Sequence, residues 1–250
     1  MKSIAAAFVF FTRLPFWRLK AFDVPVEYFS QAINYWAVVG WLTAAMMAGV
    51  LWCAAQILPH SVAVVIAILS RTLLTGALHE DGLADFLDGF GGGTTRDRTL
   101  EIMKDSHIGT YGVLGLIFYI LILFTLLNSM TINTACIAIL VADPLCKLIS
   151  SQITRFLTYA RTEETSKARI VYKRADIPAL TVSVAFGITP LILLGNMSQV
   201  LIPTALSILT FLSLVFFMKK KINGYTGDCC GAMFLICELI FYLAYIAIHN

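Results

Sequence analysis

Charged residues are scarce in this chain of 250 residues. Asp, Glu, Lys and Arg together make up 13% of the sequence, about half of the fraction that globular domains carry. With 59% hydrophobic residues, the chain is too apolar to be intrinsically disordered, and its mean hydropathy of +0.83 excludes an ordinary soluble enzyme. The composition therefore predicts an integral membrane protein.

The sequence also lacks paired cysteines and basic runs interleaved with aromatic residues. Its six cysteines form no C-x-x-C motif, and most lie within apolar segments, so we expect buried, reduced thiols rather than a disulfide framework. The net charge of +3 is typical of the cytoplasmic loops of a membrane protein. It gives no basis for binding to nucleic acid.

Three long windows contain no charged residue. They cover residues 28–70, 106–142 and 177–218, and each can hold two spans and a turn, because one crossing needs about 20 apolar residues. We therefore predict an all-α, polytopic membrane helix bundle, one domain over 1–250 with about seven transmembrane helices. The expected spans are 32–58, 62–78, 110–128, 131–151, 178–195, 199–218 and 229–248.

Lys and Arg are distributed unevenly among the segments that connect these spans. The N-terminal segment and the loops 79–109, 152–177 and 219–228 hold almost all of them. By the positive-inside rule, we expect these segments to face the cytoplasm, with the N-terminus inside and the C-terminus outside. Residues 4–11 are apolar but too short to cross, so they predict a short interfacial or re-entrant helix.

Seven of the fifteen acidic residues lie within residues 80–105. The segment HEDGLADFLDGFGGG is expected to continue the second span as a helix, which places Asp81, Asp85 and Asp88 on one stripe. Carboxylates so arranged repel one another unless a cation lies between them, and Mg²⁺ is typically held by a few carboxylates together with substrate phosphates. The alternative interpretation is a solvated acidic face at a helix end.

A second acidic stripe follows the glycines, on a helix expected to begin at Thr94. Its acids are Asp97, Glu101 and Asp105. Because Arg98 and Lys104 lie alongside, the stripe is consistent both with an amphipathic helix held by internal salt bridges and with a second side of the metal site. Asp105 is the favoured ligand.

Several charged residues lie outside these stripes. Asp228 lies at the start of the last span, where it either caps that helix or supplies another metal ligand. Within the spans, Glu238 must face the bundle interior and find a partner. Asp143 and Lys147, at i and i+4, are expected to pair, and Arg71 is a candidate partner for a phosphate or a carboxylate.

The loop 152–177 is rich in Lys and Arg. Basic residues opposite an acidic metal cluster suit a diphosphate substrate, because the carboxylates hold Mg²⁺, the metal bridges the phosphates and the basic side chains neutralise the remaining charge. Contact with phospholipid head groups would leave the same pattern in the sequence.

Three segments resemble a known family. HEDGLADFLDGFGGGTTRDRTLEIMKDSHIGTYG and NGYTGDCCGAMFLICELIFYLAY resemble the signature regions of cobalamin synthase (adenosylcobinamide-GDP ribazoletransferase), and FFTRLPF resembles the N-terminal segment of that family. The similarity extends from Phe10 to Tyr245. It implies an inner-membrane enzyme that joins adenosylcobinamide-GDP to α-ribazole, or to its 5′-phosphate, in the last stage of cobalamin nucleotide-loop assembly. GMP would be released and Mg²⁺ required.

With this resemblance, the candidate residues fall into three groups. The expected Mg²⁺ ligands are Asp81, Asp85, Asp88, Asp105 and Asp228. One of the stripe carboxylates, Asp81, Asp85 or Asp88, or else His79, would accept the proton of the attacking ribose hydroxyl. The expected substrate contacts are Arg13, Arg98, Lys104, Ser106 and Thr226. The two substrates and the lipid bilayer are the expected partners, and a homo-oligomer is compatible with the sequence.

Two other classes of function stay open at this stage. CDP-alcohol phosphotransferases and aromatic prenyltransferases also place Asp-rich helix ends around Mg²⁺. The first class expects D-G-x-x-A-R, whereas DGLA is followed here by Asp85, and the second expects a repeated Asp-rich motif, whereas the second half offers only Asp228. A membrane transporter would place its functional charges near the bilayer midplane, whereas most acids here lie at one end of the spans.

Overall fold

A computed structural model of the chain describes residues 1–161, 170–194 and 197–249, and it is helical, with no strand among the described residues and one isolated bridge. The all-α prediction is confirmed. The α-helices are α1 (Lys2–Phe11), α2 (Trp36–Ala54), α3 (His60–Thr75), α4 (Leu78–Gly92), α5 (Arg96–Lys104), α6 (Thr110–Ser129), α7 (Ile132–Ser151), α8 (Ile153–Phe156), α9 (Ile177–Leu194), α10 (Met197–Ile222) and α11 (Gly227–His249). Three 3-10 helices precede α2, namely η1 (Phe16–Arg18), η2 (Lys20–Phe22) and η3 (Val26–Tyr35).

Five helical segments of the described chain are long and apolar enough to cross a membrane. They are Val26–Ala54, Thr110–Ser129, Ile132–Phe156, Gln199–Ile222 and Gly227–Ile248. Helices α3 and α4 make a sixth if they count as one broken span, while α9 is a shorter apolar helix. A multi-pass membrane bundle is therefore supported, but the expected count of seven spans is not confirmed. The N-terminal helix is present as α1, and its interfacial placement stays a prediction.

The outer surface of the bundle is apolar. On α6 and α10, large side chains such as Phe118, Leu121, Leu209 and Phe216 are between 53% and 70% exposed. A water-soluble protein rarely exposes such a continuous apolar surface. In a membrane, lipid tails would cover this surface. All six cysteines are free, as expected, and four are buried while Cys53 is exposed.

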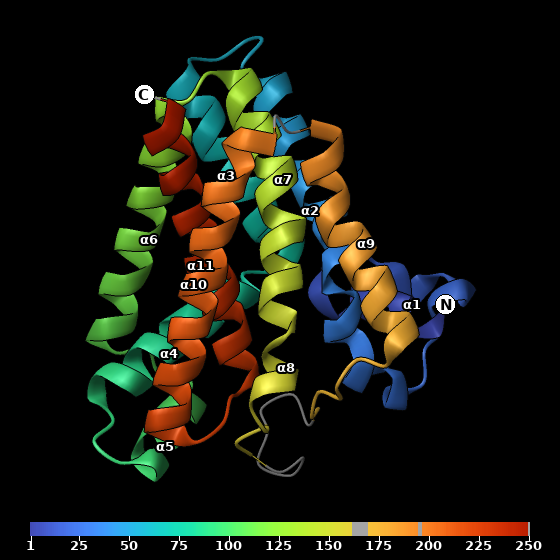
Figure 1. Cartoon of the computed structure of the whole chain (residues 1–250), viewed down its shortest axis with the longest axis vertical. Coiled ribbons are helices and arrows are strands. Elements are labelled where there is room, and N and C mark those ends of the chain that lie inside the picture. The colour runs from blue at the N-terminus through green and yellow to red at the C-terminus, as the bar shows by residue number, and fades with distance from the viewer. Residues whose placement is uncertain (162–169, 195–196, 250) are drawn as a thin grey trace.

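The chain bends sharply between α3 and α4. Gly76 (φ +65°) and Ala77 (φ +56°) both adopt the left-handed conformation that ends a helix, and the axes of the two helices differ by 88°. The prediction that the second span continues as one helix to the glycines is therefore wrong. As a result, α4 and its three aspartates run nearly perpendicular to α3 (Figure 1).

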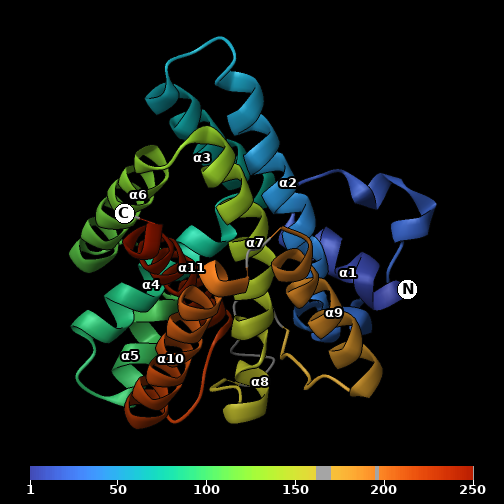
Figure 2. The same cartoon turned by 45° about the horizontal axis from the view of Figure 1, so that its top comes forward.

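The charged loops meet at one end of the bundle, beside α4, α5 and α8 (Figures 1 and 2). Arg96 donates from Nε to the carbonyl oxygen of Ile222 (3.0 Å), which ties α5 to the end of α10. Tyr159 forms an isolated bridge with Tyr225, which joins the segment after α8 to the start of α11. These contacts bring together described parts of three of the four segments that the charge pattern predicted to share one side, namely the loops 79–109, 152–177 and 219–228.

Helix α5 begins one residue later than expected. Its N-cap is Thr95 rather than Thr94, and the Thr95 hydroxyl oxygen accepts the backbone N–H of Arg98 (3.3 Å). Arg98 also pairs with Glu101 (2.7 Å) on the exposed face. Internal salt bridges of this kind support the interpretation of α5 as an amphipathic helix.

A network of buried charges lies among the spans. Asp143 pairs with Lys147 one turn along α7, and Arg71 of α3 pairs with Glu238 of α11, all at 0% to 3% exposure. Both pairings agree with the sequence analysis, which expected Asp143 and Lys147 to pair and Glu238 to find a partner. The network joins helices that are remote in the sequence.

Candidate functional site

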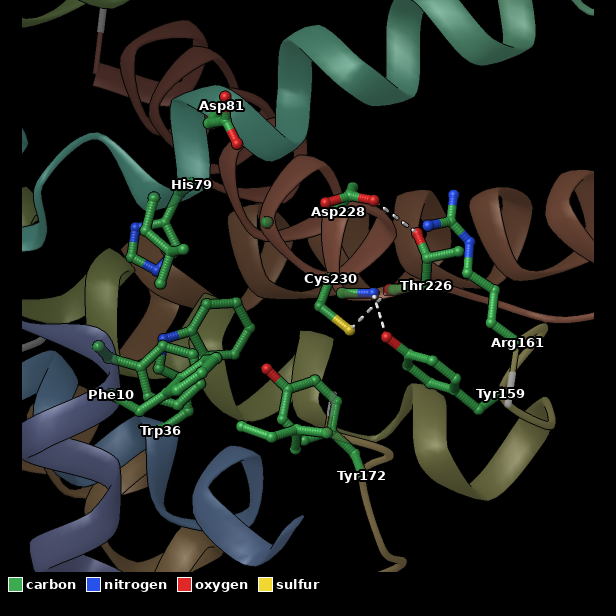
Figure 3. Close-up of a pocket in the computed structure, with 15 residues that line it drawn as sticks. Phe10, Trp36, His79, Asp81, Tyr159, Arg161, Tyr172, Thr226, Asp228 and Cys230 are labelled. Atoms are coloured by element: carbon green, nitrogen blue, oxygen red, sulfur yellow. Dashed lines mark hydrogen bonds between the residues drawn. The ribbon is translucent and has the colours of Figure 1, made fainter. Parts of the chain in front are cut away.

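A cavity of about 250 Å³, called the main cavity below, lies where α1, α4, α11 and the segment after α8 meet (Figure 3). Its polar lining residues are Asp81, Arg161, Thr226 and Asp228. Its aromatic lining residues are Phe10, Phe11, Trp36, His79, Tyr159 and Tyr172. In Figure 3 the polar group lies opposite Phe10, Trp36 and Tyr172. The cavity therefore has a charged side and an aromatic side.

Two glycines allow α4 and α11 to approach closely beside this cavity. A Cβ on Gly82 would lie 3.0 Å from the carbonyl oxygen of Asp228, and a Cβ on Gly231 would lie 3.1 Å from that of His79. Asp81 is the neighbour of Gly82 in the chain. The close approach therefore brings the carboxylates of Asp81 and Asp228 to the same cavity, although the two residues are remote in the sequence.

The charged side of the main cavity is held by hydrogen bonds. Thr226 donates from its hydroxyl to Oδ2 of Asp228 (3.2 Å), and Arg161 donates to the carbonyl oxygen of Leu100 (2.7 Å), which anchors the guanidinium against α5. Two carboxylates and a guanidinium beside one cavity are the groups that a metal-bound phosphate ester requires. Arg161 belongs to the basic loop 152–177, whose residues 162–169, including Lys167 and Arg169, lie outside the described residues.

His79 lies in the aromatic side of the main cavity. It is 3% exposed, and its ring stacks on Trp36 with a centroid separation of 5.3 Å. Phe11 packs against Trp36 on the same side, at 5.0 Å. The expected role of His79 as a proton acceptor stays a prediction.

Asp88 has a defined structural role. Its carboxylate is 7% exposed and accepts the backbone N–H of Gly109 (2.7 Å) and that of Gly112 (2.8 Å) at the N-terminus of α6. A carboxylate at this position satisfies two amides that have no partner within the helix and lies at the positive end of the helix dipole. Each oxygen of Asp88 is thus engaged by α6. Its expected role as a metal ligand stays a prediction.

We expect Asp88→Ala to lower the free energy of unfolding by about 1–3 kcal/mol, because the buried amide of Gly112 and the partly buried amide of Gly109 lose their acceptor. Asp88→Asn keeps one acceptor oxygen and should cost less. Thermal unfolding in detergent micelles would measure both variants, with Asp97→Ala on exposed α5 as the control. An equal effect of the Ala and Asn variants would contradict the capping role.

A second and more open cavity of about 760 Å³, called the outer cavity, lies beyond Asp88. Its charged lining residues are Asp88, Arg98, Glu101, Lys104, Asp105 and His107. Asp105 accepts hydrogen bonds from the backbone N–H (3.0 Å) and from Nδ1 (2.7 Å) of His107, and the side-chain hydrogen bond first of all lowers the pKa of the Asp105 carboxyl. The Asp105 side chain is 56% exposed, and its hydrogen bonds are local.

The expected carboxylates therefore do not form one cluster. Asp81 and Asp228 line the main cavity, whereas Asp88 and Asp105 line the outer one. The physical reason is that seven residues of helix separate Asp81 from Asp88 by about 10 Å along the axis. Among the residues that the structure describes, no group of three His, Cys, Asp or Glu side chains is placed to hold a metal ion.

Three expected site residues line neither cavity in the described part of the chain. Asp85 is half-buried on α4, and Ser106 is exposed after α5. Arg13 is exposed, its backbone N–H donates to Leu74 (2.7 Å), and its side chain lies against Gly76 at the bend. Their roles stay predictions.

The aromatic lining of the main cavity was not predicted from the sequence. Trp36, Tyr159 and Tyr172 come from three separate segments, and only the folded chain brings them together. Phe10 and Phe11 could have been identified from the sequence, because they begin the FFTRLPF motif. Arg161 was one of several basic residues in its loop, with nothing to distinguish it.

Comparison with known proteins places the chain in a family. Residues 3–246 match the family described as cobalamin-5-phosphate synthase. The chain belongs to this family. No solved structure matches it. The family resemblance inferred from the sequence is confirmed, and the protein is a transferase of cobalamin biosynthesis.

Curated relatives support the same assignment. Three proteins named adenosylcobinamide-GDP ribazoletransferase come from Shewanella species. The Shewanella oneidensis protein is 34% identical over 242 residues, covering 96% of this chain and 91% of the relative. That of Shewanella putrefaciens is 36% identical over 244 residues, covering 96% and 92%, and that of Shewanella frigidimarina is 36% identical over 245 residues, covering 97% and 93%.

For this cobalamin-5-phosphate synthase family member, we expect Gly82→Val to lower transferase turnover about tenfold or more, because side-chain atoms at Gly82 push α4 away from α11 and misplacement by about 1 Å is costly to catalysis. Gly49→Val is the matched control, since a Cβ at Gly49 meets nothing within 4 Å. Initial rates of both purified variants would test this, and equal rates would show that the close approach does not position the site.

Proposed function

We propose that the protein transfers the adenosylcobinamide-phosphate group of adenosylcobinamide-GDP to α-ribazole or to its 5′-phosphate, and that GMP leaves. The observation that supports this most directly is the main cavity, where Asp81, Asp228 and Arg161 lie on one side and aromatic residues on the other. The names of the relatives and of the family agree with these substrates. The products are adenosylcobalamin, or its 5′-phosphate, and GMP.

The residues of the main cavity fit Mg²⁺. This ion keeps several of its waters and is usually bound through one or two carboxylates together with substrate phosphates. Asp81 and Asp228 meet that requirement, and Asp85, one turn further along α4, is the candidate for a third ligand. When bound, the metal would neutralise charge on the diphosphate and on the departing GMP.

The reaction forms one phosphorus–oxygen bond and breaks another. The ribose hydroxyl of α-ribazole attacks the phosphorus that carries the cobinamide, and the bond from this phosphorus to the bridging oxygen breaks, so that the oxygen leaves with GMP. Asp81 or Asp228 accepts the hydroxyl proton, since both are carboxylates at the charged side. Arg161 neutralises phosphate charge, and the aromatic side excludes the water that would otherwise hydrolyse the diphosphate.

We also propose that the charged end of the bundle faces the cytoplasm of a bacterial inner membrane. The loops that meet there hold most of the Lys and Arg residues, including Lys219, Lys220 and Lys221 at the end of α10. Helix α11 ends at the opposite end of the bundle (Figure 1). A reporter fused to the C-terminus that is active only outside the cytoplasm would test this orientation.

The proposed function is tested with purified protein in lipid nanodiscs, supplied with adenosylcobinamide-GDP, α-ribazole and Mg²⁺. We expect GMP and a new corrinoid in equal amounts, and loss of both when the metal is removed with a chelator. Parallel reactions with α-ribazole 5′-phosphate would identify the preferred acceptor. Release of GMP without α-ribazole would indicate a hydrolase and contradict the proposal.

A further inference from the structure

The aromatic side of the main cavity is built from nearly parallel rings. Phe11 and Trp36 stack with an interplanar angle of 18°, and Trp36 and His79 with an angle of 29°. Tyr172 meets Phe10 edge-on at a centroid separation of 6.3 Å. Flat faces beside edges make a site suited to a planar aromatic ligand, because offset stacking and edge contacts are the favoured aromatic geometries.

Two polar atoms in this aromatic side have no partner. Nε1 of Trp36 and Nε2 of His79 are buried without a hydrogen-bond partner among the described residues, and the two side chains are 0% and 3% exposed. Buried polar groups are nearly always hydrogen-bonded, because an unsatisfied one costs about 1–3 kcal/mol. The indole N–H can only donate, whereas an imidazole nitrogen can donate or accept. A ligand with an acceptor atom on its ring would supply the missing hydrogen-bond partner for one of these two nitrogens.

The size of the cavity limits the occupant. A volume of about 250 Å³ cannot hold a corrin ring together with its nucleotide. Only one end of a substrate can enter, either the guanine of adenosylcobinamide-GDP or the base of α-ribazole.

The chemistry of the aromatic side favours the second of these bases. Guanine carries three polar groups along one edge and needs several partners, whereas a benzimidazole ring is apolar apart from one free nitrogen. The charged residues Asp81, Arg161 and Asp228 lie at the other side of the cavity, where they serve the phosphates.

Resting on the proposed function, we infer that the aromatic side of the main cavity is the binding site for the base of α-ribazole. The ring lies along the aromatic side, its free nitrogen accepts the indole N–H of Trp36 or a proton on Nε2 of His79, and its ribose extends toward Asp81 and Asp228. His79 and Trp36 are then specificity-determining residues. The hydroxyl proton goes to a carboxylate rather than to His79.

The test uses Trp36→Phe and His79→Phe, which keep a ring and remove the donor. The ring nitrogen accepts one hydrogen bond, so we expect the KM for α-ribazole to rise about tenfold in the variant that loses that donor, while the KM for adenosylcobinamide-GDP changes less than twofold in either variant. Trp41→Phe is the matched control, because Trp41 lies on the same helix, lines neither cavity and donates instead to the carbonyl oxygen of Phe186 (2.8 Å). It should leave the KM for α-ribazole unchanged.

An analogue of the acceptor provides a second measurement that needs no variant. A riboside with an indole base, in which carbon replaces the free nitrogen, should have a KM about tenfold above that of α-ribazole with the unmodified protein. With the variant that loses the relevant donor, the two acceptors should become equivalent. Equal KM values for both acceptors with the unmodified protein would overturn the inference.

The outcomes separate this inference from the proposed function. If the variants still release GMP and their KM for α-ribazole changes less than twofold, the base binds elsewhere and the transferase activity stands. If the KM for adenosylcobinamide-GDP rises instead, the cavity holds guanine and the inference is wrong. Absence of GMP release from the unmodified protein would overturn the function itself.

Discussion

Asp228→Asn is expected to lower the rate of GMP release at saturating substrates by at least about 100-fold, the loss that follows removal of one electrostatic contact to a transition state. The amide keeps the shape of the side chain and can still accept the hydroxyl of Thr226. It carries no charge to attract a cation and accepts a proton poorly. Asp81→Asn should behave in the same way, since Asp81 lines the same cavity.

The dependence on metal concentration separates two roles for these carboxylates. If Asp228 acts as a ligand, raising the Mg²⁺ concentration should restore part of the activity of Asp228→Asn. If it accepts the proton, higher Mg²⁺ will not help, but the rate should depend differently on pH. Asp97→Asn is the control, because Asp97 is 91% exposed on α5 and pairs only locally with Arg96. A rate near that of the unmodified protein for Asp228→Asn would contradict the proposed site.

Asp85 tests how far the site extends along α4. Its position one turn beyond Asp81 led the sequence analysis to place it in the metal site, and Asp85→Asn should then abolish transfer while the protein stays in the membrane. The comparison with Asp88→Asn is informative, because Asp88 is engaged by the amides of α6. A large loss for Asp85 and a small one for Asp88 would limit the metal site to the first half of the stripe.

The acidic stripe illustrates what the sequence can predict. Helical spacing correctly identified α4 as the element that carries the aspartates. Spacing cannot reveal what packs against each turn. The first turn of α4 faces α11, whereas Asp88 faces the N-terminus of α6, and this difference divides one apparent cluster between two cavities.

The bend between α3 and α4 shows a second limit. Gly76 is a typical residue for the end of a helix, but Ala77 adopts a positive φ that only the tertiary structure explains. A continuous helix was the natural prediction from hydropathy.

The buried charges show the same limit of prediction from sequence. The pairing of Asp143 with Lys147 follows from their helical spacing, whereas Arg71 and Glu238 are 167 residues apart and meet only after folding.

The buried charges lead to the second large expected effect. Lys147 donates to the Thr43 hydroxyl oxygen (2.6 Å) and pairs with Asp143, and Arg71 lies 3.6 Å from Asp143 while it pairs with Glu238. Two cations and two carboxylates therefore balance in the interior. Removing one charge leaves another without compensation in a low-dielectric environment, which typically costs about 3–5 kcal/mol.

We therefore expect Lys147→Met to lower the thermal unfolding midpoint in detergent by about 10 °C. The double variant with Asp143→Leu should recover most of this loss, because it removes both members of one pair and leaves Arg71 balanced by Glu238. Lys220→Met, at the exposed end of α10, controls for the loss of a lysine. The double variant has no imbalance of charge. If it were as unstable as the single variant, the loss of stability would come from packing around Lys147, and the prediction would be contradicted.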